Sequence, residues 1–257
     1  MDGKMNYKKS QVTIFIIVAI IIIAIIILLF MLKAKGSVGI FGQSMPNPNE
    51  YIEKCVSDNI NEALNIMFPQ GGYLNSENYI KYKDNKVQYL CYTKEFYKPC
   101  INQEPLFIEH LEKEIKKYAE SKIRDCFYAL EQEYKKNNYN VNSGSMEFKI
   151  ELEPGQISSE ISKKLDIKKN EETKTYDKFK IKIKSPAYEI GVIANEIASQ
   201  EAKFCYFEYL GYSLLYPNIK IDKEDINSDT KIYSIEEKAS KKKITIAIRS
   251  CAFPAGI

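Results

Sequence analysis

Two stretches with alternating side chains decide the fold class, MEFKIELE at residues 146–153 and TYDKFKIKIK at residues 175–184. Apolar and charged residues take turns along both, so one face of each segment is apolar and the other is charged. A period of two is typical of a β-strand with one face on the core and one in water. Pro154-Gly155 is a turn signal, and another strand is expected over residues 156–167. We therefore expect an antiparallel sheet with one solvent-exposed face.

Three other segments show the three- and four-residue spacing of amphipathic helices. They cover residues 49–68, residues 105–136 and a stretch that runs from Pro186 to about Gly211. The pair Gly71-Gly72 ends the first of them. The apolar side chains expected to face the core are Ile52, Cys55, Val56, Ile60, Leu64 and Met67 in the first helix, Phe107, Leu111, Ile115, Tyr118, Cys126, Leu130 and Tyr134 in the second, and Ile190, Ile193, Ile197 and Phe204 in the third.

Short apolar runs between and after the helices predict further strands. Residues 79–83 and 86–92 would form a hairpin around a turn at Asp84-Asn85. Three more strands fit residues 218–222, 231–236 and 243–250. Because helices and strands are grouped rather than strictly alternating, we predict an α+β domain of about three helices and antiparallel strands. It would cover residues 49–257, as one domain or as two subdomains with a break near residues 137–145.

An uncharged apolar run at residues 12–32 precedes this domain. A helix of 21 residues spans about 30 Å, which is the thickness of the hydrocarbon core of a bilayer. A cleaved signal peptide would have a shorter apolar region and a small-residue cleavage site, and a buried helix would keep a polar face. We therefore predict a single transmembrane helix at residues 12–32 that binds the lipid bilayer, after a cytoplasmic tail at residues 1–11. Glycines and prolines then predict a flexible linker over residues 33–48.

The flanking charges and the cysteines favour one topology. The N-terminal tail carries Lys4, Lys8 and Lys9, against Lys33 and Lys35 on the other flank, which favours a cytoplasmic N-terminus. All six cysteines follow the apolar run, and an even number on one side of a membrane is typical of an oxidising compartment. We therefore predict a single-pass membrane protein with an extracytoplasmic C-terminal domain.

The cysteines are expected to form three disulfides. Cys91 and Cys100 are close in sequence, so they are paired first. Cys55 and Cys126 lie on the apolar stripes of two helices that could pack together, which leaves Cys205 and Cys251. Six cysteines allow fifteen connectivities, so each pairing is a hypothesis.

Composition excludes or disfavours several function classes. Residues 1–35 hold five of the 37 cations and one of the 34 acids, so the rest of the chain carries 32 cations and 33 acids. This balance, with only Arg124 and Arg249 as arginines, argues against a nucleic-acid partner. A single histidine, His110, makes His-His metal pairs impossible, and no nucleophile elbow, phosphate loop or calcium loop occurs. We expect no catalytic residue, no cofactor and no metal site.

Tyrosine is the enriched side chain that suits recognition. Six tyrosines lie between residues 73 and 97, and such side chains offer contact area with a polar tip. They would either form a binding surface for a protein or a glycan, or make cross-strand pairs that cover the core face of the hairpin. The six are Tyr73, Tyr79, Tyr82, Tyr89, Tyr92 and Tyr97.

The N-terminus resembles two groups of archaeal proteins. Residues 8–15, KKSQVTIF, are similar to the start of archaeal type IV prepilins, and the resemblance implies cleavage between Ser10 and Gln11. Phe15 stands where many bacterial-type pilins have glutamate, and the glycines after Leu32 would interrupt a filament spine.

The other resemblance extends over most of the chain, to uncharacterised membrane-anchored proteins of small-genome archaea. It rests on the QVTIFII start, on residues 51–55 (YIEKC) and 70–73 (QGGY), and on the final strand at residues 246–251 (IAIRSC). This group implies no activity.

Three functions remain open from the sequence. The first is a cell-surface protein whose extracytoplasmic domain has a structural, adhesive or binding role. A pilin-like filament subunit is the second, which processing before Gln11 would favour. A surface hydrolase is the third, which would need a concave pocket with two carboxylates. Ligand, disulfide connectivity and oligomeric state are left open.

Overall fold

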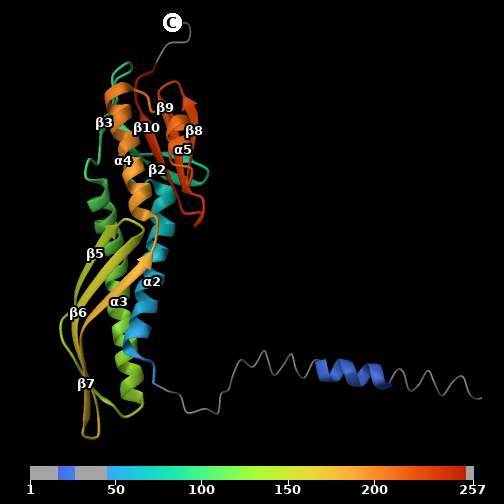
Figure 1. Ribbon diagram of the computed structural model, residues 1–257, viewed down its shortest axis with the longest axis vertical. Helices are drawn as coiled ribbons and strands as arrows, with labels where there is room; N and C mark the ends of the chain where they lie inside the picture. The colour runs from blue at the N-terminus through green and yellow to red at the C-terminus, as the bar shows by residue number, and fades with distance from the viewer. Residues whose placement is uncertain (1–16, 27–44, 253–257) are drawn as a thin grey trace, which may run out of the picture. The chain divides into compact units, whose positions relative to one another are not determined.

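The computed structural model describes residues 17–26 and 45–252, and the chain divides into two units, Met1–Met45 and Pro46–Ile257 (Figure 1). In the first unit residues 17–26 are helical and their apolar side chains are exposed. Among the described residues no helix is both long enough and apolar enough to cross a membrane. The predicted transmembrane helix at residues 12–32 lies only partly within the described residues. The predicted tail, residues 1–11, and most of the linker lie outside them.

The second unit is an α+β fold built on two long helices, α2 (Pro48–Met67) and α3 (Phe107–Lys136). The two helices pack together, and Ile52, Ile60, Leu111 and Ile115 are fully buried as the sequence predicts. Tyr118 is only half-buried, because the buried stripe of α3 continues through Ala119, Ile123 and Phe127. Asn47 caps α2 by accepting a hydrogen bond from the backbone of Asn49. α3 begins two residues after Pro105, so Pro105 does not open this helix.

A 3-10 turn, η1 (Phe68–Gln70), ends α2 as the glycine pair predicts. Gly71 has φ +78° and Gly72 has φ +87°, a backbone conformation that residues with a Cβ atom rarely adopt. A Cβ atom on Gly72 would also lie 2.7 Å from the ring of Phe107. Glycine is therefore required here for both backbone conformation and packing.

A four-stranded antiparallel sheet covers the two long helices. It consists of β4 (Asn140–Ser143), β5 (Glu147–Glu153), β6 (Gln156–Lys169) and β7 (Glu172–Lys184), with β6 paired to the other three. The alternating residues behave as predicted, because Phe148, Ile150, Leu152, Phe179, Ile181 and Ile183 are buried and the intervening lysines and glutamates are exposed. Residues 137–145, where the sequence allows a break between two subdomains, contain β4, which is paired to β6.

The second sheet has the order β1-β2-β10-β9-β8. Its strands are β1 (Tyr79–Tyr82), β2 (Asn85–Tyr92), β8 (Ile219–Asn227), β9 (Thr230–Glu237) and β10 (Lys243–Arg249), and the short β3 (Ile101–Asn102) pairs with β2. β10 and β2 run parallel, whereas the sequence predicts antiparallel strands. Parallel neighbours need a long connection, and 150 residues lie between the end of β2 and the start of β10, so local patterns do not reveal the pairing.

Three further predicted details are wrong. The hairpin turn is at Lys83-Asp84, both with positive φ, because Asn85 already pairs with Tyr82. The third helix, α4 (Ala187–Phe204), ends at Cys205 in the left-handed conformation rather than near Gly211. Phe204 is consequently 61% exposed instead of facing the core. A separate short helix, α5 (Tyr209–Leu215), follows beside β8 and buries none of its residues.

Candidate functional site

The second sheet curls so that side chains of its two edge strands meet over one face. The hydroxyl of Tyr82 on β1 donates a hydrogen bond to Glu224 on β8, although these strands are at opposite edges of the sheet. The enclosed face carries a small apolar cluster of its own, made of Val87, Tyr89, Ile232 and Ala247. A curled sheet of this kind is open at its ends, and the open ends of such structures are frequent ligand sites.

A β-bulge in β2 brings a second tyrosine onto the enclosed face. Ala247 lies opposite Tyr89, but Ile248 lies opposite Cys91, so β2 contains one extra residue at this point. The extra residue shifts the alternation, and Tyr92 therefore packs on the same face as Tyr89, with ring centroids 5.1 Å apart. Bulges redirect side chains in this way and are frequent beside functional sites.

The open end of the enclosed face is a hollow of about 560 Å³, which we call the tyrosine hollow. It is formed by the start of β1, the end of β2, the β8–β9 turn, the end of β10 and the loop 93–100. Its volume is within the range of about 300–1,000 Å³ that is usual for ligand sites. The lining residues are Asn78, Tyr79, Tyr89, Tyr92, Phe96, Asn227, Ser228, Asp229, Thr230 and Arg249.

An ion pair lies against the aromatic side of the hollow. Arg249 donates from Nε to Oδ2 of Asp229 at 2.7 Å and from a terminal nitrogen to the hydroxyl of Tyr92 at 3.3 Å. Its guanidinium carbon is 5.7 Å from the ring centroids of both Tyr92 and Phe96, close enough for cation–π contact. The side chains of Arg249 and Asp229 are 24% and 14% exposed, so the pair faces the hollow while most of its surface is covered.

The electrostatics of the pair keep both partners charged. Burial alone would raise the pKa of Asp229, but hydrogen bonds from Arg249 and Thr230 outweigh it, and the pKa lies below its ordinary value. The bond to Asp229 raises the pKa of Arg249 further. Burial raises the pKa of Tyr89, so this phenol stays neutral. The hollow therefore combines one positive charge, one negative charge and neutral hydroxyl groups at neutral pH.

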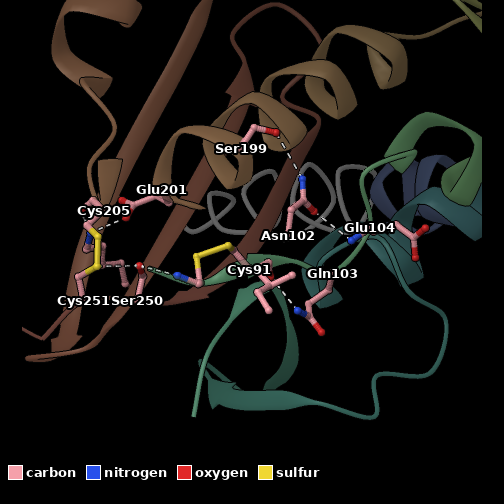
Figure 2. Close-up of a disulfide and its surroundings, with 12 residues drawn as sticks. Cys91, Asn102, Gln103, Glu104, Ser199, Glu201, Cys205, Ser250 and Cys251 are labelled. Atoms are coloured by element: carbon pink, nitrogen blue, oxygen red, sulfur yellow. Dashed lines mark hydrogen bonds and ion pairs between the residues drawn. A yellow bond between two sulfur atoms is a disulfide. The ribbon is translucent and has the colours of Figure 1, made fainter. Parts of the chain in front are cut away.

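Two disulfides hold the segments around this end of the sheet (Figure 2). Cys91–Cys100 closes the loop that carries Phe96, and Cys205–Cys251 joins the end of α4 to the residues after β10. Ser250 connects them, because the backbone N–H of Cys100 donates to its hydroxyl at 3.2 Å.

The third disulfide, Cys55–Cys126, joins α2 to α3. All three pairs are those proposed from the sequence.

The six predicted tyrosines do not form one surface. Tyr79, Tyr89 and Tyr92 line the hollow, and Tyr82 closes the curl of the sheet. Tyr73 packs on His110 instead, with ring centroids 4.0 Å apart, and Tyr97 is 65% exposed on the loop 93–100. The proposed binding surface is thus divided, with half of its tyrosines in one place.

Sequence reasoning missed the charged half of the hollow. Asp229 and Arg249 are 20 residues apart and no motif links them. The one available signal was the rarity of arginine, since Arg249 is one of only two in the chain. Phe96 also went unnoticed because it lies in a loop without periodicity.

His110 has a structural place rather than a position in the hollow. Its Nε2 atom is 3.0 Å from the carbonyl oxygen of Gly72, and its Nδ1 atom is 3.5 Å from a carboxylate oxygen of Glu104. Its side chain is 12% exposed and stacks on Phe107. It therefore ties the glycine turn after α2 to the first turn of α3.

A separate cleft between the two sheets contains two carboxylates, Glu189 and Glu237. Glu189 accepts a hydrogen bond from the backbone of Gly155 at 2.7 Å, and Glu237 accepts from Ala239 and Ser240 at 3.1 and 2.7 Å. Both side chains thus hold backbone turns, which does not favour the acid pair that a hydrolase needs.

The predicted processing site, Ser10 and Gln11, lies outside the described residues. In comparisons with known proteins, no family model, curated protein or solved structure matches this chain.

Proposed function

We propose that the protein is a membrane-anchored cell-surface binding protein whose extracytoplasmic domain takes its ligand in the tyrosine hollow. The observation that carries the proposal is the arrangement of Arg249, Asp229, Tyr92 and Phe96 at the open end of the curled sheet. Aromatic rings with a few fixed polar groups are the usual composition of a binding site. The site depends on the β-bulge and on two segments that are far apart in sequence, one with Tyr92 and Phe96 and one with Asp229 and Arg249. This arrangement favours a specific binding role over a hollow that arises by chance on the surface.

The location outside the cell is supported by two features. The uncharged run at residues 12–32 has the length of a membrane anchor. Three disulfides, with no free cysteine among the described residues, are compatible with an oxidising compartment. The resemblance to archaeal anchored proteins points the same way. We propose that the N-terminus lies in the cytoplasm and that residues 49–257 lie outside.

Binding is favoured over catalysis by the state of the polar groups. The carboxylate of Asp229 is already bonded to Arg249 and Thr230, so it is held as an ion-pair partner rather than as a free base. Fixed, charge-balanced groups of this kind orient a ligand without transferring protons to it.

The adhesive role is tested with the full chain reconstituted in fluorescent liposomes and added to cells of the native host. We expect the liposomes to bind to the cells, and the change Phe96→Ala to reduce binding strongly. Phe96 is 57% exposed, so its removal leaves the core intact. Tyr128→Ala is the matched control, because Tyr128 is 64% exposed on α3, outside the hollow. Equal loss in both variants, or no loss in either, would refute a role for the hollow.

The topology and the filament alternative are tested by the intact mass of the protein from native membranes. A full-length mass that rises by about six hydrogens on reduction is expected for an anchored protein with three disulfides. Loss of the first ten residues would instead support prepilin-type processing before Gln11. The absence of a mass change on reduction would place the domain in the cytoplasm.

A further inference from the structure

We propose that the ligand of the tyrosine hollow is an uncharged sugar ring, an inference that rests on the hollow being the binding site proposed above. Three properties of its lining carry this choice of ligand class. They are the balance of charge, the aromatic faces, and the polar groups that have no partner among the described residues.

The charge of the hollow is balanced before any ligand arrives. Arg249 and Asp229 are the charged residues among those that line it, and they are paired at 2.7 Å. A carboxylate or phosphate ligand would meet Asp229 beside the arginine, and a cationic ligand would meet Arg249 beside the aspartate. Displacing either partner would leave a mostly covered charge unpaired, which is costly. An uncharged ligand avoids this cost.

The aromatic side of the hollow offers ring surface to a ligand. Phe96 is 57% exposed, and Tyr79 and Tyr92 are partly exposed around the same space. The C–H groups on one face of a sugar ring are apolar and pack against such surfaces, while the hydroxyl groups point outward around the rim. A wholly apolar ligand would pack against these rings but would leave the neighbouring polar groups covered and without hydrogen-bond partners.

Several polar groups of the lining are free to bond hydroxyls. The side chains of Asn78, Asn227 and Ser228 make no hydrogen bond to another described residue. One terminal nitrogen of Arg249 is likewise unbonded within the described part of the chain, and the hydroxyl of Tyr92 accepts from Arg249 and keeps its own proton to donate. Donors and acceptors are thus mixed around the rim, as a ring of hydroxyl groups requires.

The test uses the full chain in lipid nanodiscs and saturation-transfer NMR with methyl glycosides of glucose, galactose, mannose and N-acetylglucosamine. We expect at least one of them to bind. Phe96→Ala and Arg249→Gln should each weaken that binding about tenfold or more, through lost ring contact and lost charge-assisted hydrogen bonds. Tyr128→Ala should leave it unchanged. Because Arg249→Gln could disturb the fold, the exposed Phe96 carries the decisive comparison.

Glucuronic acid and adenosine are the contrasting probes. Stronger binding of glucuronic acid than of the neutral sugars would overturn the proposal in favour of an anion site. Stronger binding of adenosine would make the ligand a planar aromatic ring. Absence of binding by all four glycosides, or binding that Phe96→Ala does not weaken, would also overturn it.

The sugar proposal fails separately from the function on which it rests. Periodate cleaves the vicinal diols of glycans and leaves the polypeptide backbone of surface proteins intact. If liposome binding to cells depends on Phe96 and is lost after periodate treatment of the cells, both proposals stand. If it depends on Phe96 but survives the treatment, the binding function stands and the ligand class is wrong. If it does not depend on Phe96, the hollow is not the binding site.

Discussion

A buried ion pair joins the end of α4 to β9 on the face of the sheet opposite the hollow. Glu201 is fully buried, and its carboxylate accepts from Nζ of Lys231 at 2.6 Å and from the hydroxyl of Tyr233. Lys231 also donates to the backbone carbonyl of Cys205 at 2.7 Å, and its side chain is 12% exposed (Figure 2 shows Glu201 beside Cys205). The substitution Lys231→Met keeps the length of the side chain and removes its charge.

This change leaves a fully buried carboxylate with one remaining neutral donor. Breaking a buried pair by removal of one partner typically costs about 3–5 kcal/mol, because the remaining charge stays desolvated. The carbonyl of Cys205 loses its donor as well, which adds to the loss. Tyr233→Phe removes only a hydrogen bond to a charged group and is expected to cost about 1.5–3 kcal/mol. The unfolding free energy is therefore expected to be highest for the parent, lower for Tyr233→Phe and lowest for Lys231→Met.

Urea unfolding with the disulfides intact measures these differences, and the transition is monitored by near-ultraviolet circular dichroism of the tyrosines. The double variant Glu201→Gln, Lys231→Met removes both charges and keeps an acceptor for Tyr233, so it is expected to recover much of the loss. A cost below about 1 kcal/mol for Lys231→Met would mean that water reaches the pair, as at a surface salt bridge. A double variant less stable than Lys231→Met alone would mean that the unpaired carboxylate of Glu201 is not the source of the loss.

Three further predictions concern the disulfides, the glycine turn after α2 and the stability at acid pH. Cys55–Cys126 closes a loop of 71 residues, so replacing both cysteines with alanine is expected to lower the unfolding free energy by about 4 kcal/mol in the chain-entropy model. Replacing Cys91 and Cys100, which close a loop of nine residues, is expected to lower it by roughly 2.5 kcal/mol, and urea unfolding measures both values. Gly72→Ala should destabilise by about 1–3 kcal/mol because the added methyl group meets Phe107, and a melting temperature equal to that of the parent would contradict this. Asp229 has a lowered pKa in the folded protein, so its stabilising contribution is present at neutral pH and is lost as the pH falls below its ordinary value of 3.8. The stability difference between parent and Asp229→Asn should accordingly be constant above that pH and shrink as the pH falls below it, and a difference that does not shrink there would argue against the ion pair.

The local parts of this fold were predictable from residue patterns. Alternation places Phe148 and Ile181 on the buried face of the four-stranded sheet, because each strand there has one wet side. The helical stripes placed Cys55 and Cys126 on facing sides of α2 and α3 and so suggested their pairing. Short elements without a pattern were missed, such as β4, whose sequence NVNS shows no run of apolar residues.

The candidate site depends on contacts between segments far apart in the chain, which cannot be predicted from the residue pattern of a single sequence. The bulge beside Tyr89 follows from the register with β10, which is determined by packing between distant segments. The pair of Asp229 and Arg249 forms because a turn and a strand end meet in space, and neither residue is marked by its neighbours in the chain. The tyrosines alone gave a partial indication, and they could not distinguish Tyr92, which lines the hollow, from Tyr73, which packs against His110.

The disulfides also determine how the domain would respond to mechanical tension between an anchor and a captured ligand. The loop from Cys91 to Cys100 is nested within the loop from Cys55 to Cys126, and the loop from Cys205 to Cys251 is separate. Between the two large loops lie about 80 residues, which include the whole four-stranded sheet. No disulfide lies within this segment, and it would span roughly 260 Å if pulled straight. Tyr92 belongs to the first loop and Arg249 to the last. A ligand that grips both side chains would therefore hold the two loops together, and the four-stranded sheet between them would bear no load.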